Sequence, residues 1–441
     1  VFGAKGDLDF ADLSYDIFMT KDRVNSTENI PVLALSSRVN LLLDATDGGI
    51  SLCAGGYNPF GLTNEISLSA ECQQYIAPES VSSLETNRRL FEIIVNGYLF
   101  ELPAGDVMFS LSASYREDKL KTQIDVSIQT NDALGLGATI PTQGITETTE
   151  IGGELLIPVL NNLDLTAGYR ISGQDVTGDA DSWNLGVEWR ASDTIFIRGS
   201  LQQAVRAPNV GELFTSPFAS EITVGEAGTG GDPCDSRNSP DSDTLAICTA
   251  QGASEEALPN FQHGTTSLPL LISGNNDLET ETADTLTVGA VWQPQLDNQD
   301  ISITLDYWQI NIEDVINAIA GSDVLDRCYS SDQNLGLNPN NLFCQLISRD
   351  TAGNVTQVSS KFLNLAALET SGIDLQINHS FEIDSGILRT NAFIGFLSSY
   401  DVQSFPNEAF VDEAGTVNGT ANRAADNNFH PEVKFILTPI Y

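Results

Sequence analysis

The sequence has no long apolar run. Its longest runs are short, such as Pro31–Leu35 and Leu268–Ile272. A membrane-spanning helix needs about 20 consecutive apolar residues, so a helical membrane protein is excluded. This absence leaves strands possible, because a strand that alternates apolar and polar residues produces no such run.

Basic residues are scarce. The chain has 441 residues with 20 Lys and Arg against 60 Asp and Glu, which gives a net charge of −40. A surface this acidic repels phosphate backbones, so the charge argues against binding to nucleic acid. An anionic membrane surface would also repel the chain unless most of its charge lies on loops away from the headgroups.

Residue patterns for catalysis or for cofactors are also missing. The three histidines have no metal-ligand spacing, and neither a phosphate-binding glycine loop nor a nucleophile elbow occurs. The sequence therefore predicts neither an enzyme nor a cofactor. The acidic stretches Asp175–Asp181 and Gly231–Asp243 have the oxygen ligands that Ca²⁺ prefers, but without EF-hand spacing they are better read as solvated loops.

The six cysteines fall into local pairs within polar segments. The pairs are Cys53 with Cys72, Cys234 with Cys248, and Cys328 with Cys344. Zinc sites use tighter knuckles, so three loop-closing disulfides are the better interpretation. Disulfides place these loops in an oxidising compartment.

A two-residue period runs through most of the chain and predicts an all-β fold. In Val107–Arg116 the odd positions are apolar or aromatic and the even positions are mostly small or polar, and Leu163–Arg170, Ile301–Tyr307 and Ile373–Asn378 repeat this pattern. Strands of about ten residues with one apolar face are typical of a membrane barrel, although a soluble sandwich alternates too. The weakest stretch is Arg23–Asn87, where we expect strands at about Val32–Asp44.

Turn lengths favour the barrel over the sandwich. Tight turns are predicted at Pro103–Asp106, Asn161–Asn162, Arg190–Asp193 and Asp384–Gly386. Very long loops are predicted at about Phe214–Leu278 and Ile316–Leu363. Outer-membrane barrels alternate short turns on one side with long loops on the other. In a soluble domain, structureless loops of that length would be unusual.

Several phrases, taken in order, resemble the barrel of the TonB-dependent receptors. The sharpest is Val205–Phe214 (VRAPNVGELF), followed by Asn276–Thr285, Asp306–Ile316 and Glu369–Asp374. The resemblance marks ten positions as structural parts of the family motifs: Arg206, Pro208, Asn209, Glu212, Leu278, Glu281, Asp306, Tyr307, Gly372 and Asp374. Pro208 ends strand pairing, and we expect Arg206 to pair with Glu279, Glu281 or Asp284.

The resemblance implies a transmembrane antiparallel up-and-down barrel, and receptors of this type close with 22 strands around a plug. Residues 1–441 contain about a dozen strand candidates and nothing like the plug. We therefore expect a partial barrel domain of a longer protein, with a smaller complete barrel as the alternative.

By resemblance, the parent protein binds a scarce nutrient and imports it across the bacterial outer membrane. The nutrient would be an iron chelate, a vitamin or an oligosaccharide. Its partners would be outer-membrane lipid and, through the plug, the TonB complex. The sequence does not identify the residues that bind the ligand. Two other classes remain open: a passive porin, and a secreted acidic adhesin that binds Ca²⁺.

Overall fold

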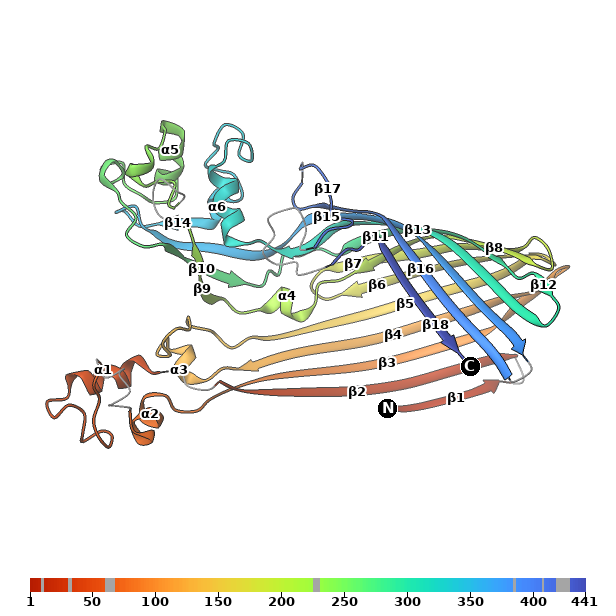
Figure 1. Ribbon diagram of the computed structural model, residues 1–441, viewed down its shortest axis with the longest axis horizontal. Coiled ribbons are helices and arrows are strands. Elements are labelled where there is room, and N and C mark those ends of the chain that lie inside the picture. The colour runs from red at the N-terminus through yellow and green to blue at the C-terminus, as the bar shows by residue number, and fades with distance from the viewer. Residues whose placement is uncertain are drawn as a thin grey trace.

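A wall of antiparallel strands forms most of the structure, as the two-residue period predicts. The computed structural model describes residues 1–8, 12–30, 34–59, 68–224, 231–383, 386–406, 408–417 and 429–441. In spatial order the wall strands are β1 (Phe2–Leu8), β2 (Leu13–Ile30), β3 (Ser80–Leu102), β4 (Gly105–Gln123), β5 (Gln143–Leu160), β6 (Leu163–Gln174), β7 (Gly178–Arg190), β8 (Ile195–Arg206), β11 (Glu281–Trp292), β13 (Gln299–Ala318), β15 (Val355–Ile383), β16 (Gly386–Gln403) and β18 (Val433–Ile440). Each pairs antiparallel with the next, and Figure 1 shows them side by side.

Short turns gather at one end of this wall, away from the helices (Figure 1). The predicted turns at Pro103–Asp106, Asn161–Asn162 and Arg190–Asp193 are confirmed, because strands end and restart around them. In the predicted turn at Asp384–Gly386, positions 384 and 385 lie outside the described residues. A short hairpin strand, β12 (Gln295–Leu296), pairs with the start of β13 at the same end.

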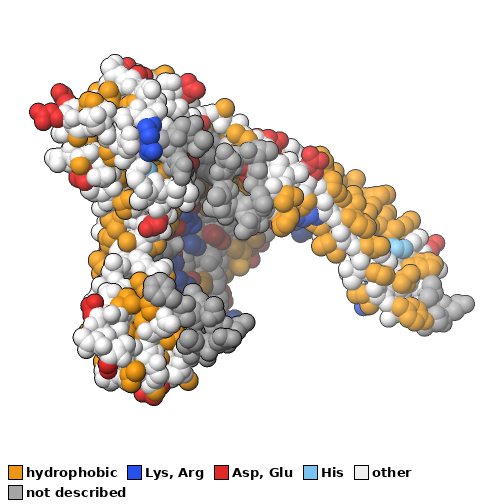
Figure 2. All heavy atoms as spheres, turned by 60° about the vertical axis from the view of Figure 1, so that its left-hand side comes forward, with side chains coloured by type: hydrophobic (Ala, Val, Ile, Leu, Met, Phe, Trp, Pro, Cys, Tyr) orange, Lys and Arg blue, Asp and Glu red, His pale blue; other side chains and the backbone are white. Residues whose placement is uncertain are grey.

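The two faces of the wall differ in polarity. On β4, Leu111, Ala113 and Tyr115 are exposed, while Ser112 and Ser114 on the opposite face are half-buried. Side chains alternate between the faces of a strand, so one face of the wall is apolar and the other polar. The apolar side chains form a broad band on the outside of the wall in Figure 2. None of the helices in the described parts of the chain is long and apolar enough to cross a membrane.

Most wall strands are longer than the ten residues expected. β3 has 23 residues and β15 has 29. The alternation marks only the part of each strand that has a uniformly apolar face. Beyond that part the outer face becomes polar, as at Arg89 and Glu117, and strand pairing continues there without the sequence signal.

The prediction of strands at about Val32–Asp44 is wrong where the structure describes this segment. Residues 36–44 form helix α1 (Ser36–Asp44), and positions 31–33 lie outside the described residues. Val39 and Leu42 are three residues apart, so they share one helix face, which packs on the Cys53–Cys72 disulfide. An apolar run this short fits a helix or a strand equally well, and packing decides.

The predicted long loops are folded rather than structureless. We call the described residues of 34–79 and 124–142 the lobe; they contain α1, α2 (Ala70–Ile76) and α3 (Val126–Gln129). We call the described residues of 218–274, 319–360 and 404–417 the head. The head contains α5 (Ser242–Ala250), α6 (Gly321–Tyr329), β9 (Phe218–Thr223), β10 (Ser267–Ser273), β14 (Ile347–Arg349), β17 (Val411–Asp412), η1 (Ser236–Asn238), η2 (Leu258–Asn260) and η3 (Cys344–Leu346).

The loop boundaries also shift. β13 continues to Ala318 and β15 begins at Val355, so the connection between them is shorter than the predicted Ile316–Leu363. No hydrogen-bonded pairing joins β1 to β18 within the described residues, and closure with 22 strands stays a prediction.

Candidate functional site

Six of the ten family-motif residues meet where β8 ends and β11 begins, at the end of the wall that carries the long connections. Arg206 and Glu281 are register partners across β8 and β11. The Arg206 guanidinium donates two hydrogen bonds to Glu281 and also pairs with Glu212 at 3.1 Å. The expected partner among three carboxylates is therefore Glu281, and Glu212 is a second one that the sequence did not suggest.

Asn209 starts a short helix, α4 (Val210–Phe214), immediately after Pro208. The Asn209 side chain accepts hydrogen bonds from the backbone N–H groups of Gly211 and Glu212, and the Glu212 carboxylate accepts one from the Asn209 N–H. This reciprocal cap satisfies N–H groups that helix formation leaves without partners. Glu212 thus both caps the helix and binds Arg206.

Glu281 also joins the strand ends to one another. Its carboxylate accepts a hydrogen bond of 2.7 Å from the backbone N–H of Ile316 on β13. Leu278, Leu213 and Ile316 pack together beside this contact as a small buried cluster. The motif therefore fixes the point where three strands of the wall pass into the long connections.

A cavity of about 450 Å³ lies against this motif on the polar face of the wall. Its lining includes Arg88, Arg116, Asp118, Glu150 and Arg206 from β3, β4, β5 and β8. Asp118 pairs with Arg88 at 2.6 Å and with Arg116 at 3.1 Å. Figure 2 shows Lys and Arg side chains in the hollow between the head and the lobe. This position and chemistry suit contact with a polar or charged solute.

The remaining motif residues lie farther along the wall, between β13 and β15. Asp306 accepts hydrogen bonds of 2.8 to 3.0 Å from Arg198, and Asp374 is its register partner. Tyr307 belongs to the outer, apolar face. At Gly372 a Cβ atom would lie 2.5 Å from the Trp308 ring, so only glycine fits. The structure thus separates the ten motif residues into six at the ends of β8 and β11 and four within the wall, between β13 and β15.

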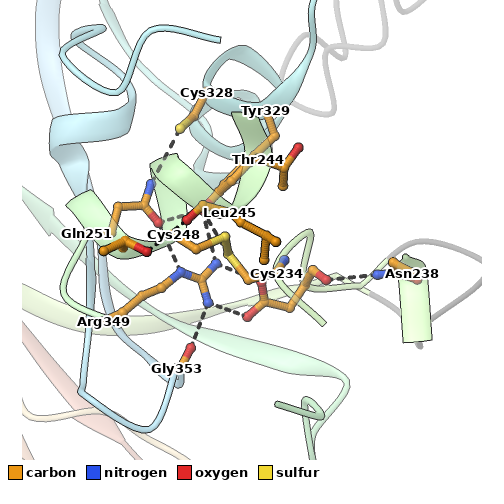
Figure 3. The surroundings of a disulfide bond; sticks show 12 residues. Cys234, Asn238, Thr244, Leu245, Cys248, Gln251, Cys328, Tyr329, Arg349 and Gly353 are labelled. Carbon is orange, nitrogen blue, oxygen red and sulfur yellow. Dashed lines mark hydrogen bonds and ion pairs between the residues drawn. A yellow bond between two sulfur atoms is a disulfide. The ribbon is translucent and has the colours of Figure 1, made fainter. Parts of the chain in front are cut away.

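All six cysteines form the three predicted disulfides, Cys53–Cys72, Cys234–Cys248 and Cys328–Cys344. The first lies in the lobe and the other two in the head. Figure 3 shows the Cys234–Cys248 bond beside Tyr329 and Arg349, which come from the other long connection of the head. The Tyr329 hydroxyl lies 3.3 Å from the Cys234 sulfur, and its burial raises the pKa of Tyr329.

One buried ion pair had no sequence signal. Arg349 and Asp232 make two hydrogen bonds of 2.6 Å, and neither side chain is exposed. The two residues are 117 positions apart and sit in different connections, so nothing in the local pattern pairs them.

The acidic stretch 231–243, considered above for Ca²⁺, has its buried carboxylates engaged by arginine. Asp232 binds Arg349, and Asp235 binds Arg237 at 2.7 Å. The Arg237 guanidinium lowers the pKa of Asp235 well below its ordinary value. In Asp175–Asp181, Asp175 accepts a hydrogen bond from the Glu147 N–H. Across the described ranges, no group of three or more His, Cys, Asp or Glu side chains is placed to hold a metal ion. Ca²⁺ binding stays a prediction.

Comparison with known families gives one match across nearly the whole chain. The family described as "TonB dependent receptor-like, beta-barrel" matches residues 19–430. No curated protein matches the sequence significantly.

Solved structures match the fold. The siderophore receptor PirA from Acinetobacter baumannii superposes with a TM-score of 0.52 at 15% identity, covering 93% of this chain and 45% of that one. A mutant of the ferric enterobactin receptor PfeA from Pseudomonas aeruginosa gives 0.52 at 15% identity, covering 90% of this chain and 45% of that one. The chain therefore spans less than half the length of these solved relatives. At this identity the likeness shows the fold alone.

Proposed function

Since the chain belongs to the TonB-dependent receptor-like β-barrel family, we propose that it forms the barrel wall of an outer-membrane receptor that binds a scarce nutrient and imports it by TonB-coupled active transport. One observation carries the proposal. A wall with an apolar outer face holds a charged cavity on its polar face, directly below the long connections. Lipid would cover the outer face, and the solute would pass along the inner one.

An iron chelate is the ligand class we favour among iron chelates, vitamins and oligosaccharides. PirA is described as a siderophore receptor and PfeA as a ferric enterobactin receptor, and one PfeA structure contains enterobactin. Ferric siderophores are bulky polar solutes with hydrogen-bonding oxygens. Arg88 and Arg116 in the cavity lining can donate to such oxygens.

The mechanism would be selective binding followed by a conformational change, without bond chemistry. The long connections would receive the ligand on the extracellular side, and the cavity at their base would hold it next. Energy would arrive from the TonB complex through a plug inside the barrel. Partners would therefore be outer-membrane lipid, the TonB complex and the ligand.

Uptake by cells that express the full-length receptor tests the proposal. Cells are starved of iron and supplied with a panel of radiolabelled ferric siderophores, with and without an uncoupler of the proton-motive force. We expect uptake of at least one siderophore, abolished by the uncoupler. Uptake that persists with the uncoupler would indicate a passive porin. Recovery of the protein as a soluble secreted species without detergent would indicate the adhesin.

A matched pair of variants links uptake to the cavity. Arg116→Gln removes a guanidinium from the lining, whereas Arg23→Gln removes one from an exposed pair with Glu85 outside it. We expect Arg116→Gln to weaken ligand binding about tenfold, as the loss of one charge-assisted hydrogen bond would. Arg23→Gln should bind like the unaltered receptor. Equal binding by both variants would exclude the cavity as the ligand path.

A further inference from the structure

The long connections of the head share one hydrophobic core. Its fully buried members include Ile247 and Leu268 from the connection between β8 and β11, and Val324 from the connection between β13 and β15. Phe405, which follows β16, is buried in the same cluster. Three connections that are far apart in the sequence thus exclude water together, and none of them could bury these side chains alone.

Strand pairing also joins the connections of the head to one another. β10 lies parallel to β15, with Leu270 opposite Val358, and antiparallel to β9. β14 pairs with the other side of the same part of β15, with Ile347 opposite Val358. Strands from two connections therefore flank the first residues of β15 and form a small sheet separate from the wall ladder.

The Arg349 guanidinium is the polar centre of the head. It has five N–H donors, and each has an acceptor. Besides the two hydrogen bonds to Asp232, it donates to the Gln251 side chain at 3.0 Å, the Gly353 carbonyl at 2.8 Å and the Tyr329 hydroxyl at 3.2 Å (Figure 3). A charge this deeply buried requires such complete pairing, because losing one partner leaves the other uncompensated.

Arg327 attaches the third connection. Its guanidinium pairs with Glu408 at 2.7 Å and stacks 3.3 Å from the centre of the Phe405 ring. Phe343 meets the same Phe405 ring edge-on, with centroids 5.5 Å apart. Helix α6, which carries Arg327, therefore contacts the connection that follows β16.

The lobe has separate cores. One packs Leu42 and Ile76 on the Cys53–Cys72 disulfide, and the other joins Leu35 to Ile128. The described contacts between lobe and head include a backbone hydrogen bond of 3.1 Å from Ala219 to Ala138. No buried cluster of the described residues contains side chains from both the head and the lobe.

From this organisation we infer that the connections of the head form one cooperative unit, which folds and unfolds as a whole and independently of the lobe. Interactions within a packed core break together, because the loss of one contact exposes the others. The surface that the head presents at this end of the wall is therefore formed or lost as a whole.

Hydrogen exchange on the full-length protein in lipid nanodiscs tests the inference. Arg349→Gln leaves Asp232 buried without its charge partner. We expect exchange to accelerate at least about 100-fold in α5, α6 and the segment around Phe405 together, the lower end of the factor that corresponds to breaking a buried ion pair. Exchange in α1 and α2 of the lobe should stay unchanged. Acceleration confined to the connections of Asp232 and Arg349, or spreading into the lobe, would overturn the inference.

A second variant keeps the test decisive if Arg349→Gln prevents the head from folding. Arg327→Gln breaks the ion pair with Glu408, and we expect about tenfold faster exchange in α5, to which no described hydrogen bond or ion pair of Arg327 runs. Arg23→Gln, which breaks an exposed wall pair, is the matched control and should change nothing in the head. An Arg327→Gln effect limited to α6 and Phe405 would also overturn the inference.

Discussion

The wall and the head place apolar side chains in opposite environments. Ile151, near the middle of β5, is 66% exposed, whereas Ile247 in α5 is fully buried. Ile151 has Ala113 and Ile171 as register partners on the same face, so it belongs to a continuous apolar surface. In the described residues the wall turns its apolar side chains outward, where lipid would cover them under the proposed function, while the head relies on side-chain packing and disulfides. The three predictions below separate these two sources of stability.

The largest effect is expected from a charge on the outer face of the wall. Under the proposed function, Ile151→Arg places a guanidinium in lipid and should destabilise the barrel by about 2–4 kcal/mol. Leu335→Arg is the control, since Leu335 is 85% exposed in the head, where water already surrounds it. Urea unfolding of the full-length receptor in lipid vesicles measures the difference. Equal stabilities for the two variants would mean that the outer face of β5 does not meet lipid.

A smaller effect, confined to the head, is expected from loss of a disulfide. Cys328→Ser combined with Cys344→Ser opens a closure of 16 residues, which is worth about 3 kcal/mol in the chain-entropy description. Limited proteolysis should then cut the head faster, while the folded barrel keeps its migration on unheated SDS gels. The control, Cys53→Ser with Cys72→Ser, should expose the lobe to protease and leave the head resistant. A shift in barrel migration with the head variant would make the wall depend on the head.

Much of the wall could be predicted from the sequence because its signal is local. The alternation in Val107–Arg116 predicts the apolar and polar faces of the strand. Turn residues such as Asn161 and Asn162 mark where one strand ends and the next begins. The cysteines pair with near neighbours, so their spacing sufficed. The ordered motif phrases placed Arg206 near the carboxylates around Glu281, although 75 residues separate that pair.

The head could not be predicted, because its contacts depend on how separate connections fold onto one another. Nothing near Asp232 indicates Arg349, and nothing near Arg327 indicates Phe405. The connections between β8 and β11 and between β13 and β15 are rich in residues that are common in solvated loops. Their apolar residues are too dispersed to show a helical or strand period. Helix α1 was misread for a related reason, since its contact with the Cys53–Cys72 disulfide settles a choice that its sequence leaves open.

The smallest effect is a dependence of head stability on pH that the wall should not share. Asp235 is buried and binds Arg237 and the backbone N–H of His263. These contacts favour the ionised carboxylate, so its pKa in the folded head lies below the unfolded value of about 3.9. The interaction therefore stabilises the head above about pH 3.9 and is lost as the pH falls toward the folded pKa, at no more than about 1.4 kcal/mol per pH unit.

Pepsin digestion between about pH 5 and pH 2 follows this loss in residues 231–263. Asp235→Asn removes the titrating group, so this contribution to the acid sensitivity of the head should vanish in that variant. An identical acid response in the variant and the unaltered protein would assign the effect to other carboxylates.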